Sequence, residues 1–350
     1  MTTAAYQQLI SAPPRDRLGL FLATANRLGT PIGNVEKDFW VCWTLNALYH
    51  ERPAEEPRLL FKGGTSLSKA YGLIQRFSED IDITVFRDDL DKAVLLEDLE
   101  ALSNKKRRAQ LDGIRAACRA YIMGPLYTFL SAQVADATNG VGRVEIDQAD
   151  PDGQTLLLWY PEVEPRDAAY VRPAVRIESG AKSALDPHQS VLIKPYVDEE
   201  TPGLDFAIAD VTTIEAGRTL WDKVVIAHGL RRWYERRGIL RQEGQRVSRH
   251  YYDLHCLLGS DVGRTALAQP NLGLDCVRHA RMFFDRPDYD LASAIPGSFA
   301  ITPIDGMIEA LNRDYGSTTA MIFGAAPDFR EILASIDGIE RIINEHPTYR

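Results

Sequence analysis

Residues 61–85, FKGGTSLSKAYGLIQRFSEDIDITV, contain two short patterns that could carry phosphate chemistry. In the first, an apolar run leads into Gly63-Gly64 and then into a helical stretch that begins with Thr65-Ser66. Glycines allow backbone N–H groups to approach a ligand closely, and the free N–H groups at the start of a helix favour a phosphate. The hydroxyl groups of the threonine and the serine add donors. The Walker A pattern GxxxxGK[ST] is absent from the sequence, so this turn is not a P-loop.

The second pattern, Ser78-Glu79-Asp80-Ile81-Asp82, enters an expected strand. Because side chains alternate across a strand, Asp80 and Asp82 should share one face, while Ile81, Ile83 and Val85 face the core. Two neighbouring carboxylates repel each other unless cations neutralise them. Hard oxygen ligands suit Mg²⁺, which keeps waters and bridges to substrate phosphates. The two patterns together predict two-metal phosphoryl or nucleotidyl transfer.

Each pattern on its own has a purely structural alternative. A D-x-D at the start of a strand is often a solvated loop end, and a Gly-Gly-Thr before a helix is usually only a turn and a cap. Their combination within one strand–turn–helix–strand unit is much rarer, and it favours the functional interpretation.

The elements that must position these residues follow from the hydrophobic periodicity. In the front half we expect helices over 5–28 and 36–49, a strand over 58–62, a helix from Thr65 and a strand over about 81–86. A basic helical region over about 90–136 then precedes strands at 143–147, 155–160, 173–178, 191–197 and 210–214. From Gly217 onward the expected helices are 217–237, 248–259, 261–268, 273–284, 303–313 and 327–345. The sequence predicts an α/β front half and a helical back half.

The composition is that of a soluble globular protein. Of the 350 residues, 45% are hydrophobic and 25% are charged. Every apolar run is shorter than the roughly 18 residues of a membrane-spanning helix, and no signal peptide is visible. The four cysteines are far apart and lack metal-binding spacing, so neither a disulfide framework nor a zinc site is expected. A reducing, cytoplasmic location fits this composition.

The charge is unevenly distributed along the chain. A net charge of −9 speaks against a general nucleic-acid binder. However, residues 104–119 and residues 231–249 each carry a local charge of +5. In the second segment we single out the candidate nucleic-acid contacts Arg231, Arg232, Arg236 and Arg237. The alternative is a solvated helix end and loop, and the segment around Lys105-Lys106-Arg107-Arg108 is the weaker candidate.

The quoted patterns, KGGTSLSKAY followed by RFSEDID, resemble the signature of the AbiEii/AbiGii toxin family, and EKDFW at 36–40 is similar to a family feature. This resemblance implies an α+β fold: a DNA-polymerase-β-like nucleotidyltransferase core, a mixed sheet with flanking helices, within residues 1–215, and a mainly helical domain in 216–350. It also implies that Asp80 and Asp82 bind Mg²⁺ or Mn²⁺. The implied nucleotide-binding residues are Lys62, Gly63, Gly64, Thr65, Ser66 and Ser78.

The family's later motifs hold a lysine on one helix and an aspartate on another, which correspond here to Lys223 in TLWDKVVIAHGL and Asp253 in RHYYDLHCLL. Independently, Lys223 shares a predicted helical face with apolar residues, where a charge needs a partner. The resemblance implies that Lys223 binds the triphosphate and that Asp253 supports the lysine or the attacking group. The alternative is a structural ion pair between the two helices.

A third strand carboxylate is common in this superfamily. Glu178 in VRPAVRIESG is the candidate third metal ligand, and Asp147 in RVEIDQ is the alternative.

The expected function is therefore that of a metal-dependent nucleotidyltransferase (EC 2.7.7 type) acting as the toxin of a type IV toxin–antitoxin or abortive-infection system, with a role in phage defence. The acceptor favoured by the family is the 3′ end of tRNA, and a cognate antitoxin is an expected partner. The alternatives are nucleotidylation of a protein and a non-catalytic nucleotide-binding scaffold. The identity of the NTP does not follow from the sequence.

Overall fold

The computed structural model describes residues 2–163, 172–241 and 246–345. Its strands are β1 (Leu59–Lys62), β2 (Asp80–Val85), β3 (Arg143–Ile146), β4 (Thr155–Trp159), β5 (Ala174–Gly180), β6 (His188–Ile193) and β7 (Ile208–Ile214). The helices of the front half are α1 (Thr2–Ile10), α2 (Pro14–Leu28), α3 (Ile32–Asn46), α4 (Gly63–Lys69), α5 (Leu96–Ala101), α6 (Asn104–Tyr121) and α7 (Tyr127–Ala137). The helices of the back half are α8 (Ala216–Arg237), α9 (Arg249–Leu258), α10 (Asp261–Leu267), α11 (Pro270–Phe283), α12 (Asp305–Thr319) and α13 (Phe329–Asn344). Short π or 3₁₀ segments are η1 (Ala47–Glu51), η2 (Arg87–Leu90), η3 (Ile122–Leu126), η4 (Tyr196–Glu200), η5 (Pro287–Tyr289) and η6 (Leu291–Ser293).

The chain forms two compact units. The sheet unit comprises residues 1–70, 77–94 and 104–213, and the helical unit comprises residues 71–76, 95–103 and 214–350. The exchange of short segments means that residues 71–76, just before the D-x-D strand, belong to the helical unit. The predicted division into folding domains at 215/216 stays a prediction.

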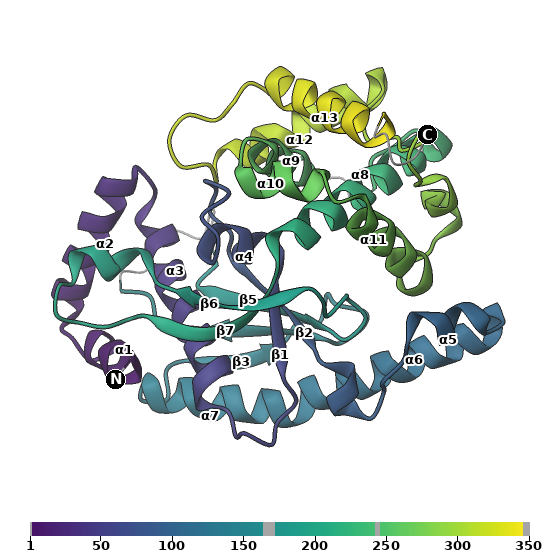
Figure 1. Cartoon of the computed structure of the whole chain (residues 1–350). Helices are drawn as coiled ribbons and strands as arrows, with labels where there is room; N and C mark the ends of the chain where they lie inside the picture. Colours follow the sequence, from purple (N-terminus) through teal and green to yellow (C-terminus); the bar gives the residue numbers. More distant parts are fainter. Residues whose placement is uncertain (1, 164–171, 242–245, 346–350) are drawn as a thin grey trace. The chain divides into compact units, whose positions relative to one another are not determined.

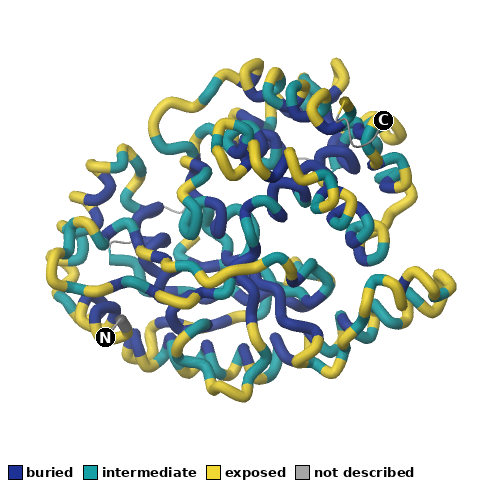
Figure 2. Tube along the Cα trace, viewed as in Figure 1, coloured by how far each residue is buried: buried dark blue, intermediate teal, exposed yellow. Residues whose placement is uncertain are grey.

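The sheet unit is built on a mixed seven-stranded sheet with the order β3-β4-β5-β2-β1-β7-β6. Its centre is β2, which pairs antiparallel with β1 and parallel with β5. Helices α6 and α7 run along one face of this sheet (Figure 1). No residue of the central strands β1, β2 and β5 is exposed, whereas buried and exposed residues alternate along α6 and α7 (Figure 2). The predicted fold class, a mixed sheet with flanking helices followed by a mainly helical region, is confirmed.

Helix α3 is the most deeply buried helix of the sheet unit, since every residue from Gly33 to Asn46 is buried. It packs against β5, and Phe39 on it makes ring contacts with Tyr6 and Phe206. A helix that is buried all round is normally apolar. The charged residues Glu36, Lys37 and Asp38 on α3 are therefore exceptions that need partners.

The helical unit is organised around α8, which contacts α9, α10 and α11. Trp221 on α8 is buried, and its indole N–H donates to the carbonyl of Ala266 at 2.9 Å. Helix α13 packs against α9 through the buried residues Ile332, Ile336 and Ile339. No helix in the part of the chain that the structure describes has both the length and the apolar character needed to cross a membrane.

Two of the predicted elements that were wrong in their bounds have a clear physical reason. The helix expected over 5–28 is two helices, because the pair Pro13-Pro14 supplies no N–H to continue α1, and Pro14 instead begins α2. The strand expected over 191–197 is β6, which spans His188–Ile193 and is followed by Pro195 and η4. Proline lacks the donor that a further ladder hydrogen bond requires.

Candidate active site

The turn between β1 and α4 is shaped to admit the carboxylate of Asp82. Gly63 has a φ of +77°, in the left-handed region that favours glycine. A Cβ added at Gly63 would lie 2.7 Å from Cγ of Asp82 and closer still to Oδ2. Lys62, the residue before the turn, lies opposite Asp82 in the β1–β2 register. Gly63 therefore brings the predicted phosphate-binding turn into direct contact with the D-x-D strand.

The hydroxyl group of Thr65 holds this turn to β2, and that of Ser66 closes the turn itself. Thr65 donates to the carbonyl of Asp80 and lies 2.8 Å from Oγ of Ser78, and Ser66 donates to the carbonyl of Gly63 at 2.9 Å. Thr65 and Ser66 are only 1% and 0% exposed. Their predicted phosphate contacts would therefore come from backbone N–H groups, since the first N–H groups of a helix have no partner within it.

The two aspartates share one face of the sheet, as predicted. In the parallel pairing of β2 with β5, Asp80 lies opposite Arg176 and Asp82 opposite Glu178. Residues paired in a sheet project from the same face, so these four side chains form one polar group. Ile81 and the other inward residues of β2 are fully buried on the opposite face.

The polar group contains an excess of negative charge. Burial raises the pKa of Asp80 to about 7, and the charges of Glu79, Glu178 and Asp82 add to that rise. Lys37 opposes it. An aspartate in such surroundings is ionised only at a cost, and a bound cation removes that cost.

Both candidate third ligands are bound to a single arginine. Arg176 donates through Nη1 to Glu178 and through Nε to Asp147 at 3.3 Å. Among the described residues, no group of three or more His, Cys, Asp or Glu side chains is arranged to hold a metal ion. Asp80 and Asp82 thus stand as a pair, and the third ligand stays a prediction.

The charged residues of α3 contact both the helix that follows the turn and the residue that precedes Asp80. Lys37 Nζ lies 2.7 Å from Oε2 of Glu79, the residue before Asp80. Asp38 pairs with Nζ of Lys69, the last residue of α4, at 2.7 Å and accepts the N–H of Tyr196. The EKDFW motif is similar to a family feature, but its sequence alone does not identify these partners.

Lys223 and Asp253, which were both predicted as site residues, meet within the helical unit. Nζ of Lys223 lies 2.8 Å from Oδ2 of Asp253. Arg76, which the sequence reasoning missed, also binds this carboxylate, with Nε 2.8 Å from Oδ1 and Nη2 2.9 Å from Oδ2. Arg76 stands in the quoted pattern RFSEDID, but no spacing rule connects it with a residue 177 positions away.

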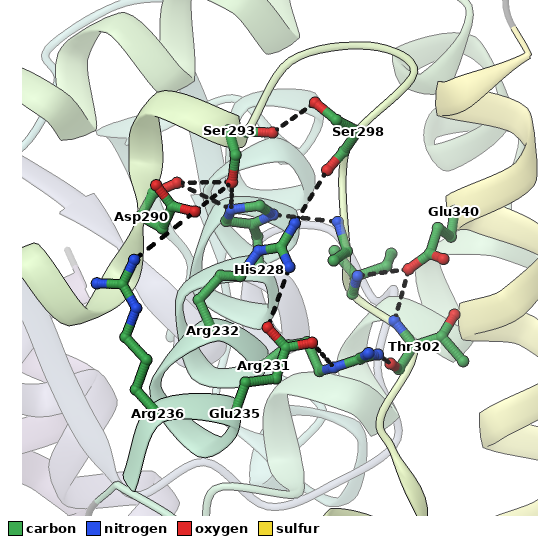
Figure 3. Close-up of polar contacts among 12 residues, drawn as sticks. His228, Arg231, Arg232, Glu235, Arg236, Asp290, Ser293, Ser298, Thr302 and Glu340 are labelled. Atoms are coloured by element: carbon green, nitrogen blue, oxygen red, sulfur yellow. Dashed lines mark hydrogen bonds and ion pairs between the residues drawn. The ribbon is translucent and has the colours of Figure 1, made fainter.

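The four arginines predicted to contact nucleic acid all have partners within the helical unit (Figure 3 shows three of them). Arg231 and Arg232 both pair with Glu235, and Arg231 also donates to the carbonyl of Thr302. Arg236 donates to the carbonyl of Pro287, and Arg237 pairs with Asp288. These arginines connect α8 with the segment 287–302. A nucleic-acid phosphate would have to compete with these contacts for the guanidinium groups. Residues 242–245 of this basic segment lie outside the described residues.

Comparison with known proteins decides the family. The profile described as "Nucleotidyl transferase AbiEii toxin, Type IV TA system" matches residues 46–335. This chain belongs to the AbiEii family. It is a nucleotidyltransferase and a toxin of a type IV toxin–antitoxin system. The match covers the turn, the D-x-D strand and both residues of the Lys223–Asp253 pair.

Other comparisons add little to the AbiEii assignment. A solved structure of MenT4, a nucleotidyltransferase toxin from Mycobacterium tuberculosis, is similar at 14% sequence identity and a TM-score of 0.39, with 92% of this chain and 97% of that chain covered. No curated protein matches the chain at a significant level.

The donor set fits a divalent ion of the kind that nucleotidyltransferases generally use. Asp80 and Asp82 offer hard oxygen ligands on one strand, and the repulsion around Asp80 is of the kind a cation relieves. Two carboxylates, with water and substrate phosphates, are a usual set for Mg²⁺.

From the raised pKa of Asp80 we predict how the free energy of unfolding of the metal-free protein depends on pH. The pKa in the fold, about 7, lies above the ordinary value of 3.8, so stability should be lost as the pH rises from about 4 to about 7. Asp80→Asn removes that loss. Since one pKa unit corresponds to about 1.4 kcal/mol and water screens part of the effect, we expect this variant to be about 1–2 kcal/mol more stable above pH 7.

Urea unfolding with a chelator at pH 5 and pH 8 measures this difference. The gain should appear at pH 8, shrink at pH 5 and shrink again when Mg²⁺ is added at pH 8. An Asp80→Asn variant that is less stable than the wild-type protein at pH 8 without metal would contradict the raised pKa.

Proposed function

We propose that this AbiEii-family toxin transfers a nucleoside monophosphate from an NTP to the 3′ end of tRNA, in a reaction that requires a divalent metal. The observation that carries the proposal is the pair Asp80 and Asp82 on one face of β2, in contact with the Gly63 turn. An acceptor hydroxyl oxygen forms a bond to the α-phosphorus and gives up its proton to water. The bond from the α-phosphorus to the bridging oxygen breaks, and pyrophosphate leaves.

Each residue of the site has a proposed part in this reaction. Asp80 and Asp82 would hold Mg²⁺ or Mn²⁺, which supplies charge neutralisation and activation of the nucleophile. The backbone of the turn at Gly64 and Thr65 would bind phosphate oxygens. In the helical unit, Lys223 would bind the triphosphate, and Asp253 would fix the position of its ammonium.

An RNA acceptor is supported by the first basic segment rather than by the second. On α6, Lys105 and Arg108 are exposed, and neither has an ion-pair partner among the described residues. Exposed cations of this kind bind phosphate backbones in a salt-dependent way. Conversely, the intramolecular contacts of the arginines on α8 favour the second candidate, a protein acceptor, because they leave less basic surface for RNA.

Label transfer separates these acceptors. The purified protein is incubated with each α-labelled NTP, Mg²⁺ and either total cellular RNA or lysate protein. We expect label in tRNA, its loss in Asp80→Ala and with a chelator, and its retention in Asp88→Ala, an exposed aspartate just beyond β2. Label in protein alone would select the second candidate, and no transfer to either acceptor with any NTP would refute both.

Toxicity gives an independent readout of the same proposal. Induced expression should arrest growth, and Asp82→Ala and Lys223→Ala should relieve the arrest while accumulating to the level of the wild-type protein. A cognate antitoxin is the expected partner in the cell. Growth arrest by the Asp82→Ala variant would show that toxicity does not depend on the proposed metal pair.

A further inference from the structure

The helical unit contains a buried cluster with more positive than negative charge. Asp253 is 0% exposed, Arg76 4% and Lys223 6%. The carboxylate of Asp253 accepts two bonds from the guanidinium of Arg76 and one from the ammonium of Lys223, all at 2.8–2.9 Å. Among the described residues, the cluster thus has two cations and one anion.

The surplus charge needs an anion. Buried charges are costly unless they are paired, and bidentate bonds from an arginine already satisfy most of this carboxylate. Burial lowers the pKa of Lys223, and Arg76 contributes to that lowering, whereas Asp253 opposes it. The ammonium group has three donors. Among the described residues, Asp253 is its one side-chain partner within hydrogen-bond distance.

The position of Arg76 is fixed by its backbone as well as by its side chain. Residue 76 forms an antiparallel bridge with Ile322, and the N–H of Phe323 donates to the carbonyl of Gln75 at 2.9 Å. Arg76 therefore approaches Asp253 from a segment held within the helical unit, rather than from a free loop.

We propose that Arg76 is a positioning residue that converts a neutral lysine–aspartate pair into a site for phosphate. Without Arg76, the ammonium of Lys223 would be neutralised by Asp253, and a triphosphate would have to compete with that carboxylate. With Arg76 present, Asp253 still orients Lys223, but the charge of the lysine is left for the ligand. The inference rests on the proposed role of Lys223 as a phosphate ligand.

Binding of inorganic tripolyphosphate, measured by calorimetry at constant pH and ionic strength, tests the charge balance. Arg76→Met makes the cluster neutral. We expect tripolyphosphate to bind roughly 10- to 100-fold more weakly, which is the change in Kd that corresponds to the loss of one hydrogen bond to a charged group. Adding Asp253→Asn restores the net charge of +1, so the double variant should recover at least half of that loss on a logarithmic scale. Arg76→Lys keeps the charge and should bind within a few-fold of the wild-type protein.

A merely structural role for Arg76 predicts the opposite order, since removing a second partner should damage the cluster further. The matched control is Arg218→Met on α8, which removes an equally buried arginine paired with Asp275 and should leave tripolyphosphate binding unchanged. In transfer assays, Arg76→Met should raise the KM for the NTP more than it lowers kcat. Wild-type binding by Arg76→Met, or a double variant that binds no better than Arg76→Met, overturns the proposal.

The role of Arg76 and the proposed transfer reaction can fail independently of each other. If the expected order of binding holds but no label is transferred to any acceptor, the transfer reaction is refuted and the role of Arg76 stands. If Lys223→Met binds tripolyphosphate as the wild-type protein does, the lysine is not the phosphate ligand and the role of Arg76 falls with it. Thermal unfolding of each variant identifies any that fails to fold. If Arg76→Met does not fold, the binding of tripolyphosphate is compared instead between Arg76→Lys and the double variant Arg76→Lys/Asp253→Asn.

Discussion

Replacing Gly63 by alanine should nearly abolish nucleotidyl transfer while leaving the protein folded. The new methyl group would lie 2.7 Å from Cγ of Asp82 and closer to its carboxylate oxygen, so either the turn or the aspartate must move. A displacement of about 1 Å in a catalytic group costs about 100-fold in rate. We therefore expect the kcat for label transfer from NTP to fall at least about 100-fold.

The backbone strain of this substitution can be separated from its steric effect. Gly63 has a φ of +77°, so alanine there also costs about 1–2 kcal/mol of stability. Gly29, which follows α2 in the same unit, has a φ of +62° and no atom within 4 Å of an added Cβ. Gly29→Ala should cost similar stability and keep the wild-type rate. Equal rates for the two alanine variants would show that contact between the turn and Asp82 does not matter for transfer.

The site was predictable from the sequence where a local rule applies. The shared face of Asp80 and Asp82 follows from the alternation of a strand, and the structure confirms it. A charge on an apolar helical face needs a partner, and the structure shows that the partner of Lys223 is Asp253. In the first case the spacing of two residues along the strand fixed the geometry, whereas in the second the apolar helical face indicated only that the lysine needs a partner.

Contacts between distant segments were not predictable in this way. Arg76 binds Asp253 across 177 residues, and Lys37 binds Glu79 across 42, so no periodicity relates these partners. The contacts of Arg231, Arg236 and Arg237 with the carbonyls of Thr302 and Pro287 and with Asp288 were not predictable, because these partners lie more than 50 residues away. A charge run shows where cations are, but only packing shows which of them are already neutralised.

The role of the EKDFW motif leads to a prediction about stability. Asp38 and Lys69 are 3% and 4% exposed at their side chains, and their charged atoms lie 2.7 Å apart. The ammonium of Lys69 also lies 3.7 Å from the centre of the Tyr196 ring. Burial alone would lower the pKa of Lys69, but the charge of Asp38 more than offsets this and raises it. The lysine is therefore charged in the fold and depends on its partner.

Asp38→Ala should lower the free energy of unfolding of the sheet unit by about 3–5 kcal/mol, since it leaves a buried ammonium without a carboxylate. Urea unfolding monitored by tryptophan fluorescence measures the loss. Asp89→Ala is the matched control, because it breaks the exposed pair with Arg58 and should cost less than about 1 kcal/mol. The double variant Asp38→Leu/Lys69→Met replaces both charges with apolar groups and should regain most of the stability. Because Lys69 ends the helix that Gly63 begins, Asp38→Ala should also reduce nucleotidyl transfer at temperatures where the protein remains folded.

A loss of less than 1 kcal/mol in the free energy of unfolding of Asp38→Ala would mean that water or another group replaces the carboxylate. In that case α3 does not hold the phosphate-binding turn through the pair of Asp38 with Lys69.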